Sequence, residues 1–129
     1  MIQRIQTIYF FIAAVLLFVF AFFTDFNLLE LVNKTINLFI PAIASVVVAF
    51  FSVVIILLFK NRNFQSKLSA FLILLVIAII AYFIYSFGIK LFYKEWTFYL
   101  LPAAMLSIFL GKQNVEKDEK LIRSVDRLR

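Results

Sequence analysis

Residues 38–59 read L-F-I-P-A-I-A-S-V-V-V-A-F-F-S-V-V-I-I-L-L-F, and this stretch decides the fold class. It contains no charged residue, and only Pro41, Ser45 and Ser52 interrupt its apolar run. A helix of about 20 such residues crosses the roughly 30 Å of hydrocarbon in a bilayer. A membrane-spanning barrel strand would instead alternate apolar and polar residues. The stretch therefore predicts a transmembrane helix.

Further apolar stretches lie on both sides of this one. With it they predict four spans, at about 5–24, 38–59, 68–89 and 93–110. The last span has the fewest apolar residues. It reaches spanning length if it extends back past Lys94, with the ammonium group extended toward water; a locally thinner bilayer or contact with a partner is the alternative. The basic turn at 60–67 is short, so the second and third spans are expected to be antiparallel neighbours, and the connection at 88–95 is tight as well.

The composition of the whole chain agrees with lipid as its solvent. Of its 129 residues, 65% are hydrophobic, 18 are Phe, and the mean hydropathy is +1.05. Soluble domains are roughly 45–50% apolar, so a soluble globular protein and a disordered chain are both excluded. We predict an all-α integral membrane protein, with an antiparallel four-helix transmembrane bundle in residues 1–111 and a charged, helical, cytoplasmic tail in residues 112–129.

The distribution of Lys and Arg predicts the orientation. All but three of the 13 basic residues lie before the first span, between the second and third spans, or after the fourth; the exceptions are Lys34, Lys90 and Lys94. Basic residues accumulate on the cytoplasmic side of a membrane, so both termini are expected in the cytoplasm. The first span is expected to be retained, because bulky residues replace a signal-peptide cleavage site after it.

The residue types that the sequence lacks exclude most kinds of catalytic and metal-binding site. There is no Cys and no His, which excludes disulfides, thiol catalysis and His-based metal or catalytic sites. The two Gly residues cannot form a glycine-rich phosphate loop. No charged residue lies in the membrane interior of any predicted span, since Lys94 and Glu95 fall at the outer end of the fourth. We therefore expect no enzyme activity, no cofactor and no metal. The net charge of +6 is explained by basic cytoplasmic segments of a membrane protein, so it does not indicate nucleic acid binding.

Small residues predict where the helices pack. Lipid tails are as apolar as Leu, so close packing at small side chains holds such bundles together. Pro41 is expected in the first turn of its helix, and Pro102 is expected to kink the fourth helix. A pore or substrate groove along the small residues is the alternative interpretation. The predicted packing positions are Ala42, Ser45, Ala49, Ser52, Ala103, Ser107 and Gly111.

The tail carries a second pattern, typical of an amphipathic helix. Glu116 with Lys120 and Glu119 with Arg123 are favourable pairs four residues apart. The apolar stripe could lie on the membrane, pack on the protein itself or meet a partner. Its members are Val115, Leu121, Ile122, Val125 and Leu128.

Three segments together carry a resemblance: M-I-Q-R-I-Q-T at 1–7, K-N-R-N-F-Q-S-K-L at 60–68, and K-D-E-K-L-I-R-S-V-D-R-L-R at 117–129. The chain resembles a family of small four-span inner-membrane proteins of unknown function from Bacteroidota. The resemblance implies a multi-pass protein of the bacterial inner membrane, and it implies no activity.

All three segments fall on the predicted cytoplasmic side, so we predict a contact surface there. Acidic residues of the tail are expected to pair with Arg4, Arg62 or Lys67. The candidate contact residues are Gln3, Arg4, Asn61, Arg62, Gln65, Asp118, Glu119, Arg123, Asp126, Arg127 and Arg129.

The resulting hypothesis is a non-catalytic accessory or scaffolding subunit of a larger inner-membrane complex, with protein export or envelope biogenesis as the expected setting. Its partners would be the lipid bilayer and other inner-membrane proteins. One alternative is a small homo-oligomeric transporter, pore or holin-like protein. Another is an interfacial lipid-binding protein or enzyme, with Asp25, Glu30 and Lys34 as its polar groups.

Overall fold

Long apolar runs form the helices of this computed structural model, which describes residues 2–28, 36–58, 60–94 and 96–128. The first three helices are α1 (Ile2–Leu28), α2 (Ile36–Leu57) and α3 (Arg62–Phe87). After them come α4 (Ile89–Lys94), the 3₁₀ turn η1 (Trp96–Tyr99) and α5 (Leu100–Arg127). The residues that the structure describes contain no strand.

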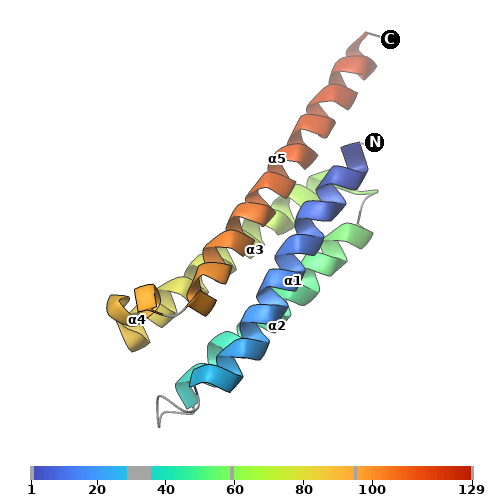
Figure 1. Ribbon diagram of the computed structural model, residues 1–129. Helices are drawn as coiled ribbons and strands as arrows, with labels where there is room; N and C mark the ends of the chain where they lie inside the picture. The colour runs from blue at the N-terminus through green and yellow to red at the C-terminus, as the bar shows by residue number, and fades with distance from the viewer. Residues whose placement is uncertain (1, 29–35, 59, 95, 129) are drawn as a thin grey trace.

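The four long helices run alternately up and down the bundle (Figure 1). Helix α1 packs against α2 and α5, and α3 packs against the same two helices. The beginning of α1, the turn between α2 and α3, and the second half of α5 therefore lie toward one end of the bundle. Helix α5 continues beyond the start of α1, so its final turns project from the bundle.

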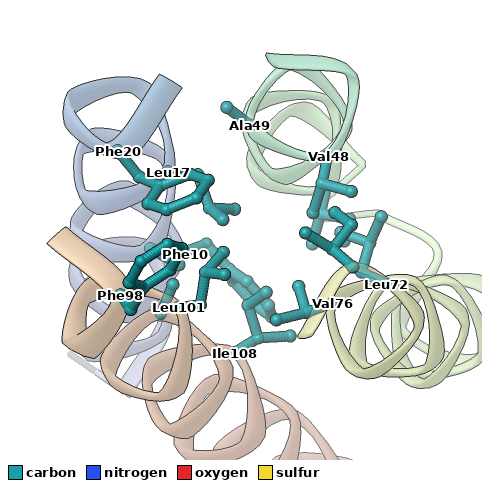
Figure 2. Close-up of a cluster of buried hydrophobic side chains, with 14 of the residues drawn as sticks. Phe10, Leu17, Phe20, Val48, Ala49, Leu72, Val76, Phe98, Leu101 and Ile108 are labelled. Carbon is teal, nitrogen blue, oxygen red and sulfur yellow. The ribbon is translucent and has the colours of Figure 1, made fainter. Parts of the chain in front are cut away.

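Each helix buries one seam of side chains spaced alternately three and four residues apart, the spacing of a left-handed bundle. The interior is apolar over most of its length, as Figure 2 shows. Buried positions are Gln6, Phe10, Ala13, Leu17 and Phe20 in α1; Pro41, Ser45, Val48, Ser52 and Ile55 in α2; Gln65, Ser69, Leu72, Val76, Ile79 and Phe83 in α3; and Leu101, Ala104, Ile108, Gly111, Val115 and Asp118 in α5.

Aromatic rings close the end of the bundle that holds η1. The Phe83 ring lies 5.6 Å from Phe20 and 4.9 Å from Phe98, in both cases edge to face. Such pairs contribute about 0.5–1.5 kcal/mol each beyond the burial of their area. Because Phe98 is only 1% exposed, η1 is anchored in the core and positions the start of α5.

Three helices are long and apolar enough to cross a membrane: Ile5–Phe23 in α1, Ile40–Leu57 in α2 and Arg62–Ser86 in α3. Their outward faces are apolar as well; Phe18, Phe50 and Leu74 are more than 60% exposed. Such a surface in water would aggregate, whereas lipid solvates it. These features suggest a multi-pass membrane protein.

The region of the fourth predicted span differs from expectation. Instead of one helix from residue 93, the chain ends α3 at Phe87 with Gly88 as its C-cap, forms α4 and η1, and begins α5 at Leu100. Gly88 has φ 78° and ψ 158°, a conformation that is nearly exclusive to glycine. Helix α5 then joins the predicted span and the predicted tail in one continuous helix.

Both prolines lie elsewhere in their helices than predicted. Pro102 falls in the first turn of α5, where a missing N–H group has no helical acceptor, so the expected kink does not arise there. Pro41 lies inside α2, because residues 36–40 contain no helix breaker and the helix begins upstream. The Ser45 hydroxyl donates a hydrogen bond to the Pro41 carbonyl at 2.7 Å.

Candidate functional site

Polar side chains from several helices gather in the core at the end of the bundle where α1 and α3 begin. We call Gln6, Gln65, Ser66, Glu116 and Asp118 the polar end cluster. Three of them, Gln6, Gln65 and Asp118, are 4–6% exposed. Buried polar groups are costly unless hydrogen bonded, so each of these groups needs a partner.

The longest-range partner joins the two ends of the chain. The Gln6 amide nitrogen donates to Asp118 Oδ2 at 2.5 Å, across 112 residues of sequence. A hydrogen bond to a charged acceptor is stronger than one between neutral groups. The pair fixes the register of α5 against α1 where their apolar contacts end, one turn beyond Val115.

The other members connect α3 with its neighbours. The Gln65 amide nitrogen donates to the Ile55 carbonyl at the end of α2 at 3.2 Å, and the Ser66 hydroxyl donates to Glu116 Oε1 at 3.0 Å. Lys112 Nζ lies 3.6 Å from the same Glu116 oxygen. All four helices thus meet through polar contacts at this end.

Neither Asp118 nor Glu119 bonds to Arg62 or Lys67 in the described structure, whereas the predicted pair of Glu119 with Arg123 is present. Asp118 accepts from Gln6, and Glu119 pairs with Arg123 of its own helix at 2.6 Å. Asp126 is exposed. The contact between the start of α3 and the middle of α5 is made instead by Ser66 and Glu116.

The predicted contact residues divide into buried and exposed groups. Gln65 and Asp118 are buried and form hydrogen bonds within the protein, and Arg62 is half-buried. The side chains of Gln3, Arg4 and Arg129 lie outside the described residues, as do those of Asp25, Glu30 and Lys34. Asn61, Arg123, Asp126 and Arg127 are exposed, and Glu119 is half-buried.

Gln6 is not among the residues predicted from the sequence. A signal for it exists: it stands at the polar end of an apolar seam that repeats every three and four residues, and Asp118 stands at the equivalent place in α5. Pairing of the two could not follow from either helix alone.

The small residues lie at different depths. Ala42, Ser45, Ala49 and Ser52 of α2 are buried, as is Gly111 of α5. Ala103 and Ser107 are half-buried, because the α5 seam passes through their neighbours Ala104 and Ile108. Gly111 allows the closest approach: a Cβ atom there would lie 3.0 Å from Phe10 Cζ.

The hydroxyl groups of the buried serines donate hydrogen bonds to backbone carbonyls of their own helices. Ser52 donates to the Val48 carbonyl at 2.9 Å and Ser69 to the Gln65 carbonyl at 2.7 Å. Such bonds leave a small, internally satisfied surface for helix contact. With apolar side chains filling the centre of the bundle (Figure 2), a polar pathway along its axis is not part of the described structure.

Beyond the polar end cluster, the last turns of α5 project from the bundle (Figure 1), and residues 120–128 are all exposed. The α5 seam nevertheless continues: Ile122 and Val125 follow Asp118 at the same alternating spacing and are 45% and 57% exposed. This exposed continuation of a buried apolar seam is the most distinctive surface of the molecule.

The chain is thus an all-helical bundle with three candidate membrane spans, a polar core end and a projecting amphipathic helix. It belongs to the family described as Domain of unknown function (DUF4293), which matches residues 2–128. No curated protein and no solved structure is significantly similar to it.

Proposed function

We propose that this protein is a non-catalytic accessory or scaffolding subunit of a larger complex in the bacterial inner membrane. The observation that carries the proposal is the seam of α5, which is buried from Leu101 to Asp118 and then runs on, exposed, through Ile122 and Val125. The partner is another inner-membrane protein that supplies a helix for the exposed part of the seam.

In this proposal α5 is the fourth span, and both termini are cytoplasmic. Its apolar half, Leu100–Leu110, is about 16 Å long at 1.5 Å per residue. The four residues of η1 add about 8 Å, so the local bilayer must thin or the protein must cover the remainder. The basic turn at 60–67 and the charged part of α5 then lie on the same, positive side.

The seam argues for a partner helix because its spacing is that of helix packing. Buried seam positions occur at 104, 108, 111, 115 and 118, and the steps of four and three continue to 122 and 125. A solvated surface helix does not need this continuity. Burying Ile122 and Val125 in a partner would contribute about 1.5–3 kcal/mol each.

The test is purification from the native host in a mild detergent, followed by quantitative mass spectrometry. We expect a stoichiometric membrane partner with the wild-type protein, and at least a tenfold loss of that partner with the double variant Ile122→Gln, Val125→Gln. The matched control, Lys120→Gln with Arg127→Gln, alters exposed residues on the opposite face of the same helix and should retain it.

Either of two results would overturn the proposal. One is a wild-type protein that purifies alone. The other is equal loss of the partner in both double variants, which would indicate charge attraction by the tail rather than packing along the seam.

A further inference from the structure

The turn that connects α2 to α3 forms an open cavity of about 360 Å³, lined by Lys60, Asn61, Arg62, Asn63, Phe64 and Lys67. We propose that this cavity binds the phosphate group of an anionic membrane lipid. The proposal requires α2 and α3 to lie in a bilayer, and it does not depend on a protein partner for the tail.

The lining residues supply the charge that a phosphate needs. Three are cationic, two carry amide groups, and none of the six is acidic. The first turn of α3 contains no acidic residue, and Asn61 makes no side-chain cap to it. The positive end of the helix dipole adds to the same field.

Glu116, the acidic residue that contacts the start of α3, is already engaged. Glu116 accepts from Ser66 and lies 3.6 Å from Lys112, on the side of α3 that faces α5. The cations of the cavity are therefore not neutralised by that carboxylate.

Arg62 gives an independent reason to expect an anion. Its Nη1 atom is buried and has no hydrogen-bond partner in the described structure. A charged donor left without an acceptor is unfavourable. Arg62 also lines the cavity, and its planar guanidinium suits the geometry of a phosphate group.

The surroundings favour a lipid phosphate over free phosphate. Phe64, which lines the cavity, is 54% exposed, and Leu57 at the end of α2 is 71% exposed. The cavity thus lies at the boundary between a basic turn and the apolar outer faces of two candidate spans. Acyl chains can lie along those faces while the phosphate occupies the cavity. Free phosphate and a soluble acidic peptide have no acyl chains and could not use the apolar faces.

The experiment titrates phosphatidylglycerol carrying a fluorophore on one acyl chain against the full-length protein in a neutral detergent, with fluorescence anisotropy as the readout. Labelled phosphatidylcholine is the neutral comparison. Cationic residues near anionic lipid contribute about 1 kcal/mol each, or about fivefold in affinity. We expect Lys60→Gln with Lys67→Gln to weaken phosphatidylglycerol binding about 20-fold, and Arg62→Gln to weaken it about fivefold or more, with phosphatidylcholine unaffected.

The matched control is Lys90→Gln with Lys120→Gln, which removes the same charge at two exposed positions outside the cavity. It should bind phosphatidylglycerol like the wild type. Equal weakening in both double variants would overturn the proposal in favour of a diffuse effect of net charge. Inorganic phosphate or an acidic peptide that displaces the lipid as well as unlabelled phosphatidylglycerol does would also overturn it, because the acyl chains would then contribute nothing.

Discussion

The hydrogen bond between Gln6 and Asp118 is the residue-level contact on which the alignment of α1 and α5 depends. Removing only the donor, in Gln6→Leu, leaves a buried carboxylate without its partner, so we expect a loss of about 2–3 kcal/mol in the free energy of unfolding. Asp118→Asn keeps an acceptor oxygen and should cost less than about 1 kcal/mol. Reversible denaturation in mixed detergent micelles measures both.

The double variant Gln6→Leu, Asp118→Leu serves as the control for this pair. Replacing both partners by apolar groups can be nearly neutral, so it should recover most of the stability lost in Gln6→Leu. If Asp118→Asn proved as destabilising as Gln6→Leu, the carboxylate would have a role other than accepting from this amide.

The contact between Gly111 and Phe10 is the second residue-level determinant. A Cβ at position 111 would lie 3.0–3.2 Å from three atoms of the Phe10 ring, which is fully buried and cannot yield easily. Overpacking costs about 1–3 kcal/mol, while Ala gains about 1 kcal/mol over Gly in a helix. We expect Gly111→Ala to be destabilising by up to about 2 kcal/mol, measured by the same unfolding assay.

The variant Phe10→Leu tests the cause. In a Phe10→Leu background the ring is gone, so Gly111→Ala should become neutral or stabilising through helix propensity alone. An equal cost of Gly111→Ala in both backgrounds would show that Phe10 is not the obstacle.

At the scale of the elements, Gly88 determines where α3 ends. It is exposed, and a Cβ atom added to it would meet no other atom within 4 Å, so any effect of substitution comes from the backbone. At φ 78° and ψ 158° a side chain costs about 1–3 kcal/mol. We expect Gly88→Ala and Gly88→Asn to destabilise by similar amounts, because this is not the left-handed helical conformation that Asn tolerates. A clear rescue by Asn in the unfolding assay would contradict the assignment.

The first three helices could be predicted from sequence because continuous apolar runs dominate their environment. The start of α5 could not, because residues 89–94 are helix-compatible and the interruption arises from the conformation of Gly88 and the burial of Phe98. Periodicity within one helix shows which face is buried but not which helix it meets. The polar end cluster, which joins residues far apart in sequence, therefore emerged only from the structure.

The last turns of α5 are helical but are expected to contribute little to the stability of the bundle. Residues 120–128 are all exposed, and the Arg123–Glu119 pair contributes only about 0.3–0.5 kcal/mol. Truncation after Glu119 should therefore leave the free energy of unfolding of the bundle unchanged to within about 1 kcal/mol. A larger loss in the unfolding assay would show that the projecting turns support the bundle directly.

At the scale of the whole molecule, the number of membrane crossings determines whether the basic turn between α2 and α3 and the exposed seam of α5 lie on the same side of the membrane. The chain contains no Cys, so single-cysteine variants can be labelled without background. Lys60, Lys90 and Lys120 are exposed, and they lie in the α2–α3 turn, in α4 and near the end of α5. With four spans and cytoplasmic termini, a membrane-impermeant maleimide should label Lys90→Cys in intact spheroplasts. It should label Lys60→Cys and Lys120→Cys only after lysis.

If α5 instead lay outside the bilayer, Lys120→Cys would react together with Lys90→Cys, and the basic turn and the seam of α5 would face opposite compartments. Labelling of Lys120→Cys before lysis would therefore overturn both the fourth span and the shared cytoplasmic surface, while leaving the three apolar spans intact.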